Sequence, residues 1–310
     1  MSTVIHFSPD LSVWILHNLN QGCAPTALIQ EMQAQQMTAQ AAHAIVAAFV
    51  TARQSGQPPP VDSVVIEDAQ QAPQPGRQSA QASEPDYVYE APIFHSGSTL
   101  HTTDRSVRIA ARAARPMLAV LEGLLSADEC EELITLARPR LTRSTVVDPP
   151  TGLNVVTGQR SSLGMFFRLQ ENGLIARLDK RISEAMNLPI ENGEGLQILH
   201  YPTGAGSAPH FDFLIPSNAA NQNSIARSGQ RVSTMVTYLN DVASGGETIF
   251  PQAGWSVSPQ RGNAVYFEYC NSRNQVDHGS LHASNPVERG EKWVATKWMR
   301  QRRFVSADGV

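Results

Sequence analysis

A histidine and an aspartate lie two residues apart in the apolar stretch APHFDFLIP, residues 208–216. If this stretch forms a β-strand, the side chains of His210 and Asp212 leave the same face, because strand side chains alternate in direction. A buried imidazole and a buried carboxylate must then pair with another group or bind a ligand. The spacing alone is weak evidence, because a His-x-Asp sequence often arises by chance.

His282, in the predicted strand SLHASNPV at residues 280–287, is a candidate third member of this cluster. Two imidazoles and one carboxylate on adjacent strands occupy one side of a metal and leave positions open for a substrate and O2. This arrangement is typical of non-haem Fe(II) oxygenases. A lone histidine is more often a core or surface residue, so the interpretation depends on the neighbouring residues.

Lys292 lies ten residues after His282 in the predicted strand KWVATKW. If its side chain points inward it needs an anion, because an unpaired buried ammonium is costly. On an edge strand it would face solvent, and periodicity does not separate these two alternatives. Tyr201 and Thr234 could donate hydroxyl hydrogen bonds to the same anion. A keto acid that chelates the metal and presents its far carboxylate to Lys292 would account for all three residues.

The first part of the chain has a different composition. Residues 1–55 predict a small all-α segment, with apolar residues at helical spacing in Ala- and Gln-rich stretches. Its LIQEMQAQQ stretch has no Lys or Arg to meet phosphates, so a docking or dimerisation element is favoured over a DNA-binding unit. Residues 56–100 are rich in Gln and Pro and predict a linker, with VDSVVIED as one short ordered patch.

Residues 101–310 predict the main domain, which is mainly β with flanking helices. Ser126 and Glu129 form a capping-box pattern before one helix, and LIARLDKRISEAMN at residues 174–187 is a second amphipathic helix. Short β runs separated by Gly and Pro then indicate an antiparallel sandwich or barrel.

Composition narrows the classes of partner. A net charge of -4 and a pI near 6.1 give no reason to expect nucleic acid or an anionic membrane as partner. Three scattered cysteines favour a reducing compartment. The sequence has neither a signal-peptide pattern nor an apolar run of membrane-spanning length, so we expect a cytoplasmic protein.

From about Pro116 to Arg300 the chain resembles the prolyl 4-hydroxylase branch of the Fe(II)/2-oxoglutarate-dependent dioxygenases. The family's motifs occur here in the family's order: LSADECEELI, RSSLGMF, LQILHYPTGAGSAPHFD, RVSTMVTYLNDVASGGETIFP and HASNPVERGEKWVATKW. The resemblance implies a double-stranded β-helix (jelly-roll) core. It also implies that iron and 2-oxoglutarate reduce O2, release succinate and CO2, and hydroxylate an unactivated C–H bond, with ascorbate in support.

The resemblance assigns roles to individual residues. His210, Asp212 and His282 become the iron ligands. Lys292 becomes the partner of the 2-oxoglutarate C5 carboxylate, supported by hydroxyl groups from two further residues, Tyr201 and Thr234. Trp298 takes the place of the aromatic wall beside the cosubstrate.

One motif position and two loops bear on the choice of substrate. Family members that act on peptidyl proline usually have an aromatic residue three positions before the first iron ligand, where this chain has Ser207. Two polar loops, residues 213–230 and 146–160, are expected to select the substrate, and the first to act as a lid. A prolyl residue in a protein or peptide is the leading candidate, and a free amino acid or small metabolite is the alternative. A non-catalytic scaffold and a cupin-like isomerase would not need Lys292.

Overall fold

The computed structural model of the 310-residue chain describes most of the sequence. The described residues are 2–20, 23, 25–34, 37–55, 57–67, 87–143, 146–147, 154–155, 162–216 and 218–306. The chain divides into two compact units, Met1–Ala82 and Ser83–Val310. No helix among the described residues is both long and apolar enough to cross a membrane.

The N-terminal unit contains three helices and two strands among its described residues. In chain order these are β1 (Ser2–His6), α1 (Pro9–Asn20), α2 (Pro25–Ala34), α3 (Ala39–Ser55) and β2 (Ser63–Glu67). The prediction of an all-α segment was therefore wrong, because β1 and β2 pair as an antiparallel ribbon with Val4 opposite Val65. Val and Ile favour strands, but each run becomes a strand only through its distant partner, which no local pattern reveals.

The predicted linker, residues 56–100, has ordered structure at both ends. Its start contains β2, and its stretch QQAPQPGRQSAQASEP lies outside the described residues. Its end belongs to the second unit, where Phe94 is buried. The backbone N–H groups of Ile93 and Phe94 donate to the Glu268 carboxylate at 3.1 and 2.8 Å. Burial raises the pKa of Glu268, so these donors stabilise a group that is costly to bury.

The second unit is built around two antiparallel sheets. The larger has the strand order β3 (Thr99–His101), β4 (Ser106–Ala114), β5 (Met117–Glu122), β16 (Ala264–Glu268), β12 (Arg231–Tyr238), β19 (Lys292–Arg300), β10 (Leu196–Tyr201), β9 (Leu163–Phe167), β6 (Thr142–Arg143). The smaller has the order β11 (Ser207–His210), β17 (His282–Ser284), β14 (Thr248–Phe250), β15 (Trp255–Val257). Two short pairs accompany them: β13 (Ser244–Gly245) with β18 (Val287–Arg289), and β7 (Val146–Val147) with β8 (Asn154–Val155).

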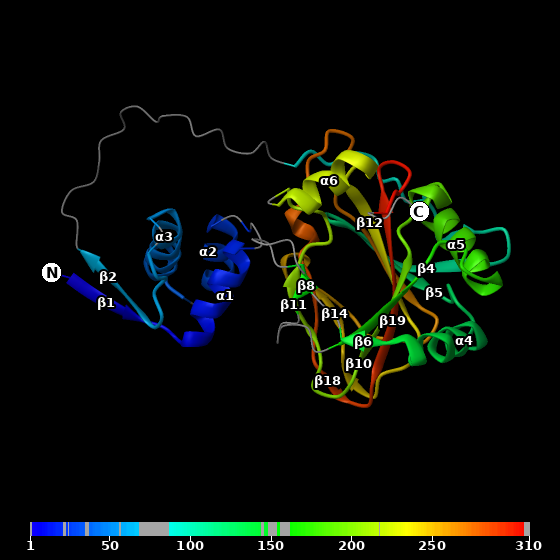
Figure 1. Ribbon diagram of the computed structural model, residues 1–310, viewed down its shortest axis with the longest axis horizontal. Helices are drawn as coiled ribbons and strands as arrows, with labels where there is room; N and C mark the ends of the chain where they lie inside the picture. Colours follow the sequence, from blue (N-terminus) through cyan, green and yellow to red (C-terminus); the bar gives the residue numbers. More distant parts are fainter. Residues whose placement is uncertain are drawn as a thin grey trace. The chain divides into compact units, whose positions relative to one another are not determined.

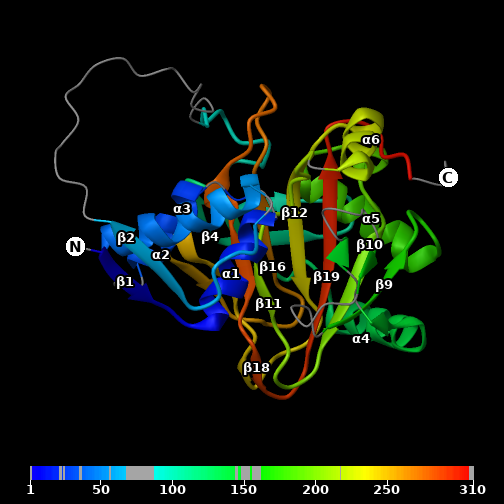
Figure 2. The same cartoon turned by 60° about the vertical axis from the view of Figure 1, so that its left-hand side comes forward.

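Strand order identifies the core as a jelly roll, as predicted. With β13 and β18 set aside, the strands β10, β11, β12, β14, β15, β16, β17 and β19 are the first to the eighth along this part of the chain. The larger sheet contains the sixth, third, eighth and first of these side by side, and the smaller contains the second, seventh, fourth and fifth. The chain thus crosses repeatedly between two sheets, which is the jelly-roll arrangement. Figure 2 shows β12, β19, β10 and β9 as neighbours.

Helices α4 and α5 lie beside the larger sheet (Figure 1). The helix α4 (Ala127–Ala137) begins with the predicted capping box of Ser126 and Glu129. The helix α5 (Gly173–Met186) packs on β19 through a buried ion pair of 2.8 Å between Asp179 and Lys297. Because side chains alternate along β19, Lys297 faces α5, while Lys292 has the opposite parity on the same strand and faces inward, between the sheets.

The predicted lid loop, residues 213–230, is not simply a loop. It contains α6 (Ala219–Ser228), which begins where the Asn218 side chain accepts a hydrogen bond from the Asn221 backbone. Gly229 follows α6 with a positive φ of 75°. Asn and Ser are typical of turns but also of helix N-caps, so the composition of this segment was ambiguous. Most of the second predicted substrate loop, residues 146–160, lies outside the described residues.

The contacts of Ile93 and Phe94 predict the outcome of two truncations. A chain that begins at Ser83 should keep the melting temperature of the oxygenase unit, because these contacts remain. A chain that begins at Ser96 should lose about 3 kcal/mol, or roughly 6–12 °C, because a buried aromatic side chain and two donors to Glu268 are removed. Calorimetry of both chains checks this. Equal melting temperatures would show that the segment before Ser96 does not stabilise the unit.

Candidate active site

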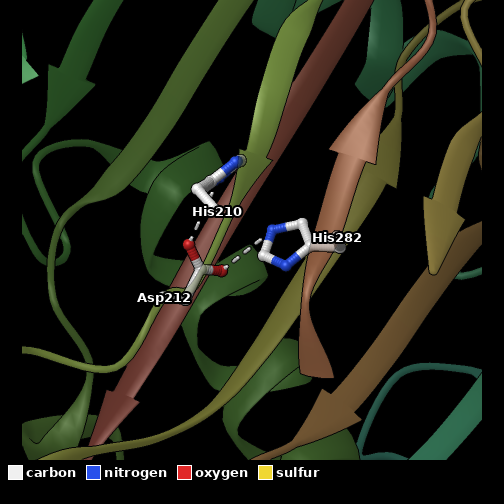
Figure 3. A group of neighbouring side chains, drawn as sticks. All are labelled: His210, Asp212 and His282. Carbon is white, nitrogen blue, oxygen red and sulfur yellow. Dashed lines mark ion pairs between the residues drawn. The ribbon is translucent and has the colours of Figure 1, made fainter. Parts of the chain in front are cut away.

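The pairing of β11 with β17 brings the predicted cluster together. His210 ends β11 and lies opposite His282, the first residue of β17. One ligand atom from each of His210, Asp212 and His282 lies within 4.8 Å of the others. Figure 3 shows the Asp212 carboxylate linked to both imidazoles by ion pairs. Its Oδ1 lies 3.8 Å from His210 Nε2, and its Oδ2 lies 3.6 Å from His282 Nε2.

Backbone carbonyls determine how each imidazole is oriented. His210 Nδ1 lies 2.9 Å from the Ala208 carbonyl oxygen, and His282 Nδ1 lies 3.0 Å from that of Ser280. A carbonyl oxygen only accepts, so each Nδ1 carries a proton and donates it. The Nε2 atoms therefore face Asp212, and this leaves Nε2 as the atom through which each histidine would bind a metal.

Asp212 is buried yet ionised. Burial alone would raise the pKa of its carboxyl group, but the imidazoles of His282 and His210 lower it to about 2. A hydrogen bond from the Thr234 hydroxyl to Asp212 Oδ2, at 2.7 Å, acts in the same direction. This contact differs from the prediction for Thr234, which assigned its hydroxyl to the anion near Lys292. The sequence placed Thr234 on the correct strand but could not distinguish between two acceptors near it.

Lys292 points inward and is only 2% exposed, so the solvent-facing alternative was wrong. Its Nζ donates to the Gly246 carbonyl oxygen at 2.6 Å and to Ser284 Oγ at 2.8 Å. Burial lowers the pKa of the ammonium to about 7, although Glu247 opposes this shift. No carboxylate of the described residues lies within 4.0 Å of Nζ, so neutral groups alone solvate the charge there. An anion in contact with Nζ would stabilise it.

One cavity joins the two charged centres. Six of the seven predicted site residues line it: Tyr201, His210, Asp212, His282, Lys292 and Trp298. The Tyr201 ring centre lies 5.4 Å from Lys292 Nζ. The Trp298 ring forms a wall of the cavity, and the Arg231 guanidinium lies over this ring at 4.1 Å from its centre.

Sequence reasoning missed two hydroxyl groups in this cavity. Thr248 and Ser284 line it together with Lys292, and they are paired across β14 and β17. The position of Ser284 could have been found, because it follows His282 by two residues and shares its strand face. Thr248 follows the glycine pair of GGET, and only the pairing of β14 with β17 reveals its position.

The donor set fits Fe(II) and a dicarboxylate together. Two neutral imidazoles and one carboxylate are a non-haem Fe(II) set that leaves coordination positions open. Lys292, Thr248 and Ser284 offer one cation and two hydroxyls for a carboxylate at the other end of the cavity. The site can therefore hold a metal and a chelating keto acid side by side.

Comparisons with known proteins agree with this geometry. Residues 196–300 match the 2OG-Fe(II) oxygenase superfamily. Prolyl 4-hydroxylase 1 of Arabidopsis thaliana is 42% identical over 202 residues, which are 60% of this chain and 70% of the relative. Probable prolyl 4-hydroxylase 3 of the same plant is 38% identical over 203 residues, with 59% and 69% covered.

Among solved structures, the chain is similar to the viral collagen prolyl hydroxylase of Paramecium Bursaria Chlorella virus-1, solved as a 2OG complex. The two share 26% identity with a TM-score of 0.47, over 59% of this chain and 95% of the viral chain. Identity to the plant relatives over more than two thirds of their length defines the family. This chain belongs to the prolyl 4-hydroxylase family of the 2OG-Fe(II) oxygenases and is a 2-oxoglutarate-dependent dioxygenase.

Proposed function

We propose that this enzyme hydroxylates prolyl residues in a protein or peptide, with 2-oxoglutarate as cosubstrate and succinate and CO2 as products. One observation carries the proposal: a buried ammonium with no carboxylate partner among the described residues shares a cavity with a His-Asp-His cluster. A metal site alone would not require Lys292, and a scaffold would require neither. The prolyl 4-hydroxylases that are 38% and 42% identical support proline as the target.

Different residues would bind the metal and the cosubstrate at the two ends of the cavity. His210, Asp212 and His282 would hold Fe(II), and Lys292 with Thr248 would hold the distal carboxylate of 2-oxoglutarate. When bound, the metal and the keto acid supply the oxidising chemistry: O2 is reduced, the keto acid becomes succinate and CO2, and a C–H bond is hydroxylated. The apolar walls of the cavity keep water away from these groups, and the hydrogen bonds from Nδ1 to the backbone orient both Nε2 atoms toward Asp212.

An adjoining groove favours a peptide over a free amino acid. Gln197 lines both the cavity and a groove of about 420 Å³ beside it. The groove also contains Phe166, which is 51% exposed and lies 6.4 Å from Trp298, between ring centres. An exposed aromatic ring is well suited to pack against the residues that flank a target proline, as in other grooves that bind Pro-rich chains. A free amino acid would leave this groove unused.

We also propose a reducing, cytoplasmic setting. Cys23, Cys130 and Cys270 are free and buried, and burial raises the pKa of each thiol to about 11. Such thiols are protonated and unreactive at neutral pH. Ascorbate would support turnover there by keeping the iron ferrous. Fractionation of cells that express the tagged chain checks the setting, and activity confined to a secreted fraction would contradict it.

We propose, finally, that the N-terminal unit docks a partner or a second copy. The opposed side chains of Val4 and Val65 on its ribbon are 49% and 65% exposed, and an exposed apolar pair favours association. Light scattering on the full chain and on the chain that begins at Ser83 separates the two cases. If both chains are monomeric, the N-terminal unit does not bind a second copy, and docking of a different partner remains. That docking would be contradicted if Val4→Asp retained every partner of the full chain.

Substrate class is tested by turnover. Succinate should form faster with proline-rich peptides than with free proline at equal concentration. Phe166→Ala should raise the peptide KM about tenfold and leave the 2-oxoglutarate KM unchanged, because only the groove is altered. Leu136→Ala, at an exposed apolar residue of α4, is the matched control, and Asp212→Ala is the inactive one. A preference for free proline, or an unchanged peptide KM in Phe166→Ala, would favour the small-metabolite alternative.

The pKa of Lys292 predicts how 2-oxoglutarate binding depends on pH. The ligand carboxylate binds the protonated ammonium and raises its pKa, so binding takes up a proton above pH 7. Affinity should be highest well below pH 7 and fall as pH rises through it, to roughly 25-fold weaker at pH 8.5 than at pH 6.5 for a free-state pKa of about 7. Anaerobic calorimetry with Fe(II) measures this.

Lys292→Met provides the control for that profile. It removes the charge and keeps an unbranched side chain, so affinity should fall about tenfold to a hundredfold at pH 6.5 and lose its dependence on pH. If the unaltered enzyme showed the same affinity at both pH values, Lys292 would not be the titrating partner of the cosubstrate.

A further inference from the structure

The hydroxyl of Tyr269 lies behind the Asp212 carboxylate, one side chain further from the cavity. Tyr269 follows β16 directly and is fully buried, with its ring packed near Phe213 and Phe267 at 6.2 and 5.8 Å between ring centres. Its hydroxyl oxygen lies 2.9 Å from Thr234 Oγ1. Thr234 Oγ1 lies in turn 2.7 Å from Asp212 Oδ2. Three side chains from separate segments thus form one continuous hydrogen-bonded relay.

The chemistry of the three groups determines the direction of every proton. Ionised Asp212 can only accept, so the single Thr234 proton is donated to Oδ2. With its proton committed, Thr234 can only accept from Tyr269, and the phenol is the donor. Burial raises the pKa of Tyr269 well above its ordinary value, and the negative charge of Asp212 adds to this, so the phenol retains its proton. The relay runs one way, from Tyr269 through Thr234 to Asp212.

This relay fixes the carboxylate rather than contacting the substrate. Thr234 lies between Phe267 on β16 and Trp298 on β19, in the middle of the larger sheet. Neither Thr234 nor Tyr269 is among the described residues that line the cavity. Asp212 is also held at its backbone, where Arg231 Nη1 donates to its carbonyl oxygen at 3.2 Å. The hydrogen bond to Oδ2 is what opposes rotation of the carboxylate about its own side-chain bond.

We propose that Tyr269 is a positioning residue for the metal site: it orients the Thr234 hydroxyl, which holds the Asp212 carboxylate in its binding orientation. This inference rests on the proposed function, in which Asp212 is an iron ligand. A side chain that hydrogen-bonds directly to a metal ligand, as Thr234 does, affects metal affinity about tenfold to a hundredfold. A residue that only filled space would act through its ring, and the ring is kept in Tyr269→Phe.

The chain offers a matched control three residues earlier, on β16. Tyr266 is also fully buried, and its hydroxyl donates to Glu268 Oε1 at 3.0 Å. Its side chain leaves β16 on the opposite face, where it stacks on Phe94 at 4.4 Å between ring centres. Tyr266→Phe therefore removes a comparable buried hydroxyl from the adjoining strand without touching the relay.

The test measures Co(II) affinity of the full chain by absorption titration, which gives both the dissociation constant and the coordination spectrum. Tyr269→Phe should weaken Co(II) binding about tenfold and alter the spectrum, and Thr234→Val should do so about tenfold to a hundredfold. Thr234→Ser, which keeps the hydroxyl, should bind Co(II) like the unaltered chain. Tyr266→Phe should change neither quantity, although it lowers the melting temperature.

A double variant makes the order of the relay explicit. Once Thr234→Val has removed the middle hydroxyl, adding Tyr269→Phe should weaken Co(II) binding no further. Additive effects would overturn the relay, as would unchanged affinity and spectrum in Tyr269→Phe. Asp212→Ala distinguishes failure of the metal site from failure of the relay. If it leaves Co(II) affinity unchanged, the proposed metal site is wrong. A large loss in Asp212→Ala with no loss in Tyr269→Phe contradicts only the relay.

Discussion

Backbone pairing between β11 and β17 sets His210 opposite His282, two residues far apart in the chain. Each of these strands is short, and neither would form alone. They are held in place because the jelly roll connects them to the larger sheet, through β10, β12 and β19. A shift of one residue in this register would turn His282 away from the cavity, since strand side chains alternate. Strand pairing therefore brings the metal-binding cluster together, and the register of the sheet fixes the positions of its two histidines.

Charge is distributed unevenly around the larger sheet. Beside its helices, buried cations have carboxylates in contact: Arg181 with Glu129 at 2.7 Å and Lys297 with Asp179 at 2.8 Å. On the inner side, the described groups that Lys292 Nζ contacts are a carbonyl and a hydroxyl oxygen. The paired cations stabilise the fold, whereas Lys292 remains destabilising until an anion binds. Ligand binding should therefore raise the stability of the whole unit.

Sequence patterns predicted the features that arise locally. The capping box at Ser126 and the amphipathic helix α5 are encoded within a few consecutive residues, and both formed as expected. The family motifs predicted the jelly roll and six residues of the cavity. Patterns failed where a residue depends on a distant partner: β1 needs β2, and Thr234 has Asp212 as its acceptor in place of the expected anion. Tyr269 carries no motif at all, because its role depends on a carboxylate two side chains away.

The position of β19 has a consequence for how the protein is made. This strand carries Lys292 and Trp298 and lies between β12 and β10, both of which precede it in the sequence. During translation, β10 and β12 emerge first and have no shared neighbour until the ribosome has passed Arg300. Until then the growing chain exposes two apolar strand edges that cannot pair correctly, a state prone to aggregation. Nascent oxygenase domains should accordingly require chaperone protection until β19 has left the ribosome.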